Sequence, residues 1–216
     1  MNNLVIFTSF LEANLETKFN IFDEIMQHCN YVICLDGGYN IAADAGIKAN
    51  LLMGDMDSLS GDIPDDVPLE RFQPEKDYSD LELALRKAAE LNAKNVTIIG
   101  GIGGRLDHTI ANIQLLSQYT DSFESLTMLD GRNKCFVLSK AQMSGINIKP
   151  EPDSYLSCFS LSEQCTGLTM KNVKYPLDDH TLPRTGSLCV SNEFKNEKDA
   201  IISIKTGTLL IVISKK

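Results

Sequence analysis

Four clusters of carboxylates, cations and glycines follow short apolar runs in the first half of the chain, and their residue types suit phosphate chemistry. In a parallel α/β sheet, ligands bind outside the carboxyl ends of the strands, so residues directly after a strand carry most weight. The clusters are Asp36-Gly37-Gly38, Gly54-Asp55-Met56-Asp57-Ser58, Lys76-Asp77-Tyr78-Ser79-Asp80 and the run from Gly100 to His108.

The second cluster places two carboxylates, Asp55 and Asp57, directly after the apolar run 51–53. In an extended chain, side chains at positions i and i+2 point the same way. Hard oxygens at that spacing can hold Mg²⁺, which prefers one or two carboxylates together with substrate phosphates. A polar loop with solvated acids explains an isolated pair of this kind at least as well.

The first and third clusters also have structural explanations. Asp36-Gly37-Gly38 opens a helix whose amides could approach a phosphate, but it is also ordinary turn sequence. Ser79 and Glu82 fit a capping box, in which Asp80 would favour the helix dipole for structural reasons alone. Capping does not account for Lys76, which is either a mobile surface charge or a donor to a phosphate oxygen.

The fourth cluster contains four glycines in five positions, followed by Arg105. Such a run lets backbone amides crowd around an anion, and Arg105 supplies a planar donor for phosphate. Asp107 could instead cap the following helix, and His108 could be a buried structural imidazole. The sequence has no GxxxxGK[ST] P-loop, and a dinucleotide fingerprint starting at Gly101 would need glycine where Leu106 stands.

The elements that must position these clusters alternate between strands and helices over residues 1–120, which predicts a largely parallel sheet covered by helices. After residue 121, β-rich runs separated by turn-forming residues predict antiparallel strands in a sandwich or barrel. We therefore expect two domains, residues 1–125 and 126–216. The expected strands of the first are 4–8, 31–36, 51–53 and 95–99, and its helices lie near 17–28, 39–45, 81–91 and 106–119, the last with apolar residues at Leu106, Ile110, Ile113 and Leu116.

The composition excludes some classes of partner. The formal net charge is −9, whereas proteins that bind nucleic acid non-specifically neutralise phosphates with Lys and Arg, so no nucleic-acid partner is expected. The chain lacks an 18-residue apolar run and a basic leader, so we expect a soluble, cytoplasmic protein without a membrane partner. Six cysteines without a CxxC pair predict reduced thiols.

Taken in order, the four clusters resemble the thiamin pyrophosphokinase family, most specifically the run GGIGGRLDHTIAN from Gly100 to Asn112. The resemblance continues through Gly167-Leu168, Tyr175-Pro176-Leu177 and Ser191-Asn192, and so spans nearly the whole chain. It implies a Rossmann-like, doubly wound α/β N-terminal domain, a β-sandwich C-terminal domain that binds thiamin, and a homodimer. The implied reaction is Mg²⁺-dependent transfer of pyrophosphate from ATP to the hydroxyethyl group of thiamin, which gives thiamin diphosphate and AMP.

The resemblance also implies roles for individual residues. Mg²⁺ would be held by Asp55, Asp57 and Asp80, and Ser191 and Asn192 of the partner subunit would face thiamin. Asp57, Asp80 and Arg105 would be catalytic. The nucleotide side would be lined by Asp36, Gly37, Gly38, Lys76, Asp77, Gly101, Gly103, Gly104, Arg105, Asp107 and His108.

Some features stay open at this level. The chain has no Trp, so an aromatic partner for the thiamin ring must be Tyr or Phe. Which carboxylate, if any, accepts the hydroxyl proton is not determined. A Mg²⁺-dependent nucleotide hydrolase and a non-catalytic nucleotide-sensing module are the alternative functions, because both would use the same acids and glycines.

Overall fold

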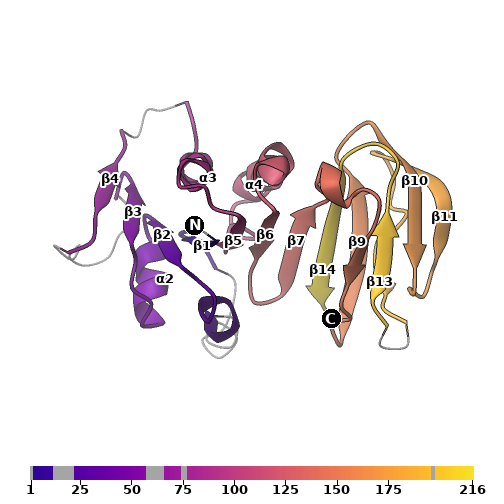
Figure 1. Ribbon diagram of the computed structural model, residues 1–216, viewed down its shortest axis with the longest axis horizontal. Helices are drawn as coiled ribbons and strands as arrows, with labels where there is room; N and C mark the ends of the chain where they lie inside the picture. The colour runs from indigo at the N-terminus through magenta and orange to yellow at the C-terminus, as the bar shows by residue number, and fades with distance from the viewer. Residues whose placement is uncertain (1, 12–21, 57–65, 74–76, 196–197) are drawn as a thin grey trace. The chain divides into compact units, whose positions relative to one another are not determined.

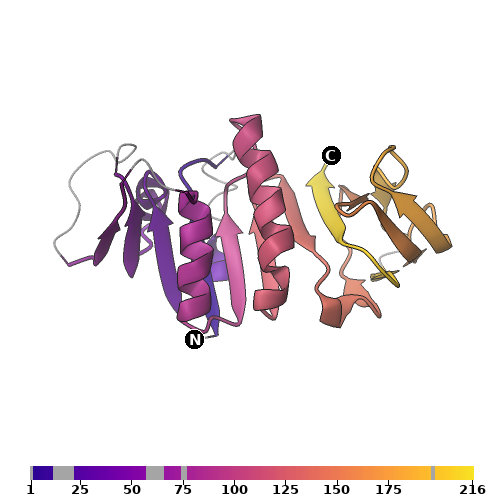
Figure 2. The same cartoon turned by 90° about the horizontal axis from the view of Figure 1, so that it is seen from above.

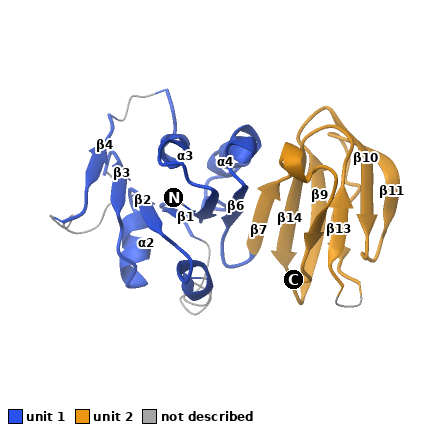
Figure 3. Cartoon of the chain, in the orientation of Figure 1, with its two compact units in different colours: residues 1–132 blue, residues 133–216 orange. Residues whose placement is uncertain are grey.

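The computed structural model describes residues 2–11, 22–56, 66–73, 77–195 and 198–216. The chain divides into two compact units, which are unit 1, Met1–Arg132, and unit 2, Asn133–Lys216 (Figure 3). Within the described segments, no helix is both long enough and apolar enough to cross a membrane.

Unit 1 is built on a parallel sheet with the strand order β4-β3-β2-β1-β5-β6 (Figure 1). Each neighbouring pair in this order is parallel. The sheet places β1 near its middle, with β2 on one side and β5 on the other. The strands are β1 (Asn3–Phe7), β2 (Tyr31–Leu35), β3 (Leu51–Gly54), β4 (Leu69–Arg71), β5 (Asn95–Ile99) and β6 (Ser125–Leu129).

Helices cover both faces of this sheet. Helix α2 (Gly38–Asp44) lies on one face, whereas α3 (Asp80–Glu90) and α4 (Leu106–Tyr119) lie on the other (Figures 1 and 2). Residues 22–26 are also helical, and a short 3-10 helix, η1 (Thr120–Ser122), follows α4. All residues from Leu4 to Phe7 in β1 are at most 2% exposed, as expected for a strand covered on both faces.

The apolar stripe of α4 is buried at only one end. Leu116 is fully buried, but Leu106 is 71% exposed and Ile110 is 50% exposed, so the apolar positions that predicted the helix are not buried in its first two turns. A helix of 14 residues is about 21 Å long. The five-residue strands β5 and β6 each span about 17 Å. Helix α4 is therefore longer than these strands, and part of it extends beyond them.

Unit 2 contains two antiparallel sheets that share one apolar core. One sheet has the order β12-β9-β14-β7 and the other β11-β10-β13-β8. Buried residues of both sheets, including Cys158, Met170 and Ile211, form a single cluster. The elements are β7 (Asn133–Val137), η2 (Lys140–Gln142), β8 (Ile146–Ile148), β9 (Ser154–Ser160), β10 (Gln164–Lys171), β11 (Leu177–Pro183), β12 (Asn192–Glu193), β13 (Ala200–Ser203) and β14 (Leu209–Lys215).

The order of elements confirms a mostly parallel first part and an antiparallel second part. Two strands differ from expectation. Strand β6 was expected to belong to the β-rich half, but it pairs in parallel with β5. Unit 1 therefore ends at Arg132, whereas the expected first domain ended at residue 125. Strand β4 was not expected, because its three residues, Leu69 to Arg71, are partly or fully exposed and show no buried apolar run.

Candidate functional site

The candidate site lies where the direction of strand progression reverses. From β1 the chain proceeds outward through β2, β3 and β4, and then returns to form β5 on the opposite side of β1. Because parallel strands end at the same edge, the loops after β1 and β5 meet at this switch point. The backbone amide of Gly101 donates to the carbonyl of Phe10 at 3.1 Å, which joins the two loops.

The glycine run has the conformation that only glycine adopts without strain. Gly100, Gly101, Gly103 and Gly104 all have positive φ, between 61° and 87°. A Cβ atom at Gly100 would also lie 2.5 Å from Oγ1 of Thr8. Both the backbone angle and the close neighbour therefore require glycine at that position.

Several amides of the run already have partners within the protein. Those of Gly100 and Gly101 donate to the carbonyls of Leu129 and Phe10, and that of Gly103 donates to Oγ1 of Thr109 at 3.1 Å. The Asn112 side chain donates to the carbonyl of Gly101 at 2.9 Å. The amides of Gly101 and Gly103 are therefore already bound within the protein, and these two glycines shape the loop.

Arg105 and Asp107 form an exposed ion pair at the start of α4. Arg105 donates from Nε and Nη2 to the two carboxylate oxygens of Asp107, at 3.2 and 2.6 Å. Hydrogen bonding to this guanidinium lowers the pKa of Asp107, and the carboxylate in turn raises the pKa of Arg105. Asp107 also accepts from the amide of His108, whose side chain is exposed, so the alternative of a buried structural His108 is wrong.

Asp36 joins the first two clusters. Its carboxylate is buried, and Oδ1 accepts a hydrogen bond from the amide of Met56 at 3.0 Å. Met56 has a φ of 69°, so the chain turns at this residue, directly after Asp55. The expectation that the carboxylates of Asp55 and Asp57 point the same way depends on Asp57, which lies outside the described residues.

The remaining acidic candidates lie at the ends of β3 and α3. Asp55 is half-buried and directly follows β3, and Asp80 begins α3, while Asp77 is exposed just before it. Asp57 and Lys76 lie outside the described residues. Among the residues that the structure does describe, no group of three or more His, Cys, Asp and Glu side chains is placed to hold a metal ion.

The capping box and the turn that the sequence offered as structural explanations are present in part. The Ser79 hydroxyl accepts from the amide of Glu82 at 3.3 Å and so caps α3, whereas Oε1 of Glu82 accepts from Arg86 and from the Tyr119 hydroxyl. Gly37 precedes α2 as its N-cap residue and makes no side-chain cap. A Cβ atom at Gly38 would lie 2.8 Å from the carbonyl carbon of Phe7, so this glycine allows α2 to approach β1 closely.

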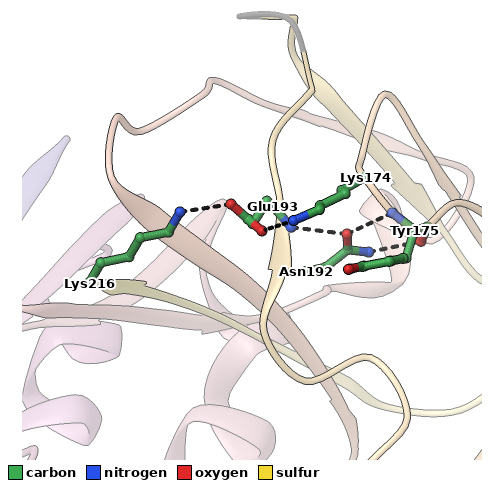
Figure 4. Close-up of polar contacts among 5 residues, drawn as sticks. All are labelled: Lys174, Tyr175, Asn192, Glu193 and Lys216. Atoms are coloured by element: carbon green, nitrogen blue, oxygen red, sulfur yellow. Dashed lines mark hydrogen bonds and ion pairs between the residues drawn. The ribbon is translucent and has the colours of Figure 1, made fainter.

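In unit 2, the side chain of Asn192 is committed to the protein itself (Figure 4). It is 3% exposed, its Oδ1 accepts from the amides of Tyr175 and Glu193, and its Nδ2 donates to the carbonyl of Tyr175. Glu193 accepts from Lys174 and Lys216 at 2.6 and 2.7 Å. Ser191 is exposed and has a φ of 56°. Asn192 therefore holds the backbone at Tyr175, a residue that is 61% exposed.

Sequence reasoning missed the residues that follow the first strand. Thr8 is buried, and its hydroxyl lies 3.1 Å from the carbonyl of Ile99 and 3.2 Å from that of Phe10. The rule that drew attention to Asp36, a polar residue directly after a strand, applies equally to Thr8. The apolar Phe10 gives no such signal.

Comparisons with known proteins agree in both units. Residues 22–128 match the family described as "Thiamin pyrophosphokinase, catalytic domain", and residues 144–209 match "Thiamin pyrophosphokinase, vitamin B1 binding domain". The thiamine pyrophosphokinase of Bacillus subtilis (strain 168) is 32% identical over 187 residues, which cover 84% of this chain and 86% of that protein.

Solved structures show the same architecture. The crystal structure of thiamine pyrophosphokinase from Bacillus subtilis aligns with a TM-score of 0.83 at 25% identity and covers 100% of both chains. Thiamin pyrophosphokinase from Candida albicans aligns with a TM-score of 0.80 at 16% identity, covering 100% of this chain and 89% of that one. At that identity the second likeness concerns the fold alone.

Proposed function

The chain belongs to the thiamin pyrophosphokinase family, and from this premise we propose how its own residues serve the reaction. It transfers pyrophosphate from ATP to thiamin. The observation that carries the proposal is the glycine loop of positive φ at the switch point of the sheet, followed directly by Arg105 and the first turn of α4. A loop of this kind binds phosphate groups through backbone amides and the helix N-terminus.

We propose that Asp55, Asp57 and Asp80 hold Mg²⁺. The donor set fits this ion, because Mg²⁺ takes oxygen ligands and needs one or two carboxylates when substrate phosphates supply the rest. When bound, Mg²⁺ would offset the negative charge of the phosphates beside these acids. Asp36 serves a different purpose, since its hydrogen bond to the amide of Met56 fixes the turn after Asp55.

On the nucleotide side, the triphosphate would lie against Gly104, Arg105 and the first turn of α4. Phosphoryl chemistry depends mainly on in-line positioning and on stabilisation of charge, which fixed backbone amides and a guanidinium provide. Arg105 is well placed to change partner, because its ion pair with Asp107 is exposed and such pairs contribute little to stability. Lys76, Asp77, Asp107 and His108 would complete this side, together with Gly37 and Gly38 at the start of α2.

On the thiamin side, we propose that Ser191 and the backbone held by Asn192 contact thiamin across a two-fold dimer. The support is the match of residues 144–209 to a vitamin B1 binding domain and the resemblance of Ser191-Asn192 to the family pattern. We also propose that the N-terminal half is a doubly wound α/β domain and that the C-terminal half is a β-sandwich. The six free thiols support a reducing, cytoplasmic location.

The reaction is tested by its nucleotide product. Purified protein incubated with thiamin, Mg²⁺ and labelled ATP should form AMP and thiamin diphosphate in equal amounts, because the family reaction attacks the β-phosphorus. ADP formed in equal amount would contradict this. Release of phosphate or pyrophosphate without thiamin would indicate a hydrolase, and ATP binding without turnover would indicate a sensing module.

A further inference from the structure

The loop after β1 holds an aromatic side chain, Phe10, in a fixed place beside the glycine run. The carbonyl of Phe10 accepts a hydrogen bond from the amide of Gly101 and lies 3.2 Å from the hydroxyl of Thr8. Thr8 is itself bound to β5, because its amide donates to the carbonyl of Ile99 at 3.0 Å. The backbone of Phe10 is thus held by both loops of the switch point.

The ring of Phe10 packs on the glycine run and still meets solvent. A Cβ atom at Gly104 would lie 3.2 Å from Cδ2 and Cε2 of the ring and 3.3 Å from Cγ, closer than most Cβ contacts, so the ring packs tightly on this glycine. Phe10 is nevertheless 43% exposed. A single exposed apolar residue is ordinary on a protein surface, but this one is anchored at the end of β1, over the loop proposed to bind phosphate.

We propose that Phe10 is a stacking platform for the base of the nucleoside triphosphate, an inference that rests on the proposed function. In a nucleoside triphosphate the ribose separates the base from the phosphates, so a base stacked on Phe10 would leave its phosphates directed along the glycine run toward the first turn of α4. An exposed aromatic face favours a planar heteroaromatic ring by stacking. Thiamin is the other heteroaromatic substrate, but the match to a vitamin B1 binding domain falls on residues 144–209, in unit 2.

Stacking has a consequence for specificity. Every base has a π-face, so a platform of this kind strengthens binding of any nucleoside triphosphate without reading hydrogen bonds on the base. Phe10 would therefore strengthen the binding of any phosphate ligand that carries a base. It would discriminate little between one base and another. Inorganic tripolyphosphate carries the same phosphate chain without a base, so it separates the two contributions.

The test compares ATP with tripolyphosphate, both with Mg²⁺, in equilibrium binding to Phe10 variants. Phe10→Ala should weaken ATP binding about tenfold and leave tripolyphosphate binding within about twofold, as expected for a contact with the base alone. Phe10→Leu keeps apolar packing on Gly104 and should also lose ATP affinity, whereas Phe10→Tyr should bind as wild type. Phe159→Ala removes a phenylalanine that is 37% exposed in unit 2 and should change neither ligand.

Kinetics distinguish the remaining outcomes. Phe10→Ala should raise KM for ATP while KM for thiamin and kcat stay near wild type. Equal losses of affinity for ATP and tripolyphosphate would mean that Phe10 only shapes the loop. A rise in KM for thiamin alone would assign the ring to thiamin. Unchanged binding of both ligands would mean that Phe10 is an exposed side chain without a role in binding. Each of these results overturns the inference. Failure of wild-type protein to make AMP from ATP and thiamin would refute the proposed function, while the binding comparison would still test Phe10.

Discussion

The carboxylate of Asp36 fills the space in which a side chain at Gly54 would begin. A Cβ atom at position 54 would lie 2.5 Å from Cγ of Asp36 and 2.9 Å from its Oδ2. Gly54 also has a φ of 141°, and it directly precedes Asp55. The last residue of β3 therefore has to be glycine so that Asp36 can bind the amide of Met56 and fix the turn after Asp55.

We expect Gly54→Ala to lose both stability and activity. Displacing Asp36 and straining the backbone should cost about 3 kcal/mol of unfolding free energy. The turn after Asp55 would also shift, and a misplacement of about 1 Å can lower kcat about a hundredfold. Urea unfolding and steady-state kinetics measure the two effects.

Gly46→Ala is the matched control for this substitution. Gly46 has a φ of 69°, but among the described residues other than its chain neighbours no atom lies within 4 Å of where its Cβ would be. We expect it to lose about 1 kcal/mol from backbone strain and to keep normal turnover. Equal losses in the two variants would show that the clash with Asp36 is not what requires glycine at position 54.

We expect Asp57→Asn to lower kcat about a hundredfold or more without changing the melting temperature. A ligand of the proposed Mg²⁺ stabilises charge in the transition state, whereas exchanging a carboxylate for an amide of the same size should disturb folding little. Asp66→Asn is the control, since Asp66 makes an exposed ion pair with Lys48 at 2.6 Å. Normal turnover of a well-folded Asp57→Asn protein would reduce Asp57 to a solvated acid.

Glu193 predicts a pH dependence of stability in unit 2. Hydrogen bonds from Lys174 and Lys216 lower the pKa of Glu193 from 4.5 to about 2. Because the folded state binds the proton more weakly, the stabilisation is complete above about pH 5. It should be lost as the pH falls through the range between 4.5 and about 2.

Urea unfolding of wild type and Glu193→Gln between pH 7 and pH 2.5 measures this. The difference in unfolding free energy should be constant above about pH 5 and should shrink steadily as the pH falls below the pKa of an unfolded carboxyl. Glu124→Gln, which removes a single exposed ion pair to Lys94, should change stability little at any pH. A difference for Glu193→Gln that does not vary with pH would show that these ion pairs do not stabilise the folded state.

The parallel arrangement of unit 1 could be predicted because local signals agree along the chain. Strand β5 and helix α4 have the bounds 95–99 and 106–119 that the sequence pattern predicts, since apolar runs there alternate with turn residues and helical periodicity. Strand β6 could not be assigned to its partner in the same way. Its apolar run is the same whether it pairs in parallel with β5 or antiparallel with a later strand, and only the tertiary structure decides.

The candidate site shows the same limit at the level of side chains. Residue types and spacing drew attention to the glycine run and Asp36 as candidates, but could not show that Asp36 binds the amide of Met56, where the chain turns away from strand geometry. Asn192 is an equally clear case. An amide that contacts a ligand and one that is buried against the backbone of Tyr175 look alike in a sequence, because the partner is 17 residues away and set by the fold.

The proposed division of the site between two subunits can be tested with two variants that are each inactive. Asp57→Ala removes a proposed metal ligand from the first half of the chain. Asn192→Ala leaves the amides of Tyr175 and Glu193 without their acceptor, which should disrupt the backbone proposed to meet thiamin. Size-exclusion chromatography must first show that each variant still dimerises.

Mixed in equal amounts, unfolded together and refolded, the two variants should recover about a quarter of wild-type activity. Random pairing makes half of the dimers mixed, and two-fold symmetry gives each mixed dimer one site with both lesions and one with neither. About one site in four is then intact. Sites confined within a single chain would recover nothing, because every chain carries one lesion. A flat zero from well-folded mixed dimers would therefore overturn the shared site, while the assignment of the reaction, which rests on its products, would stand.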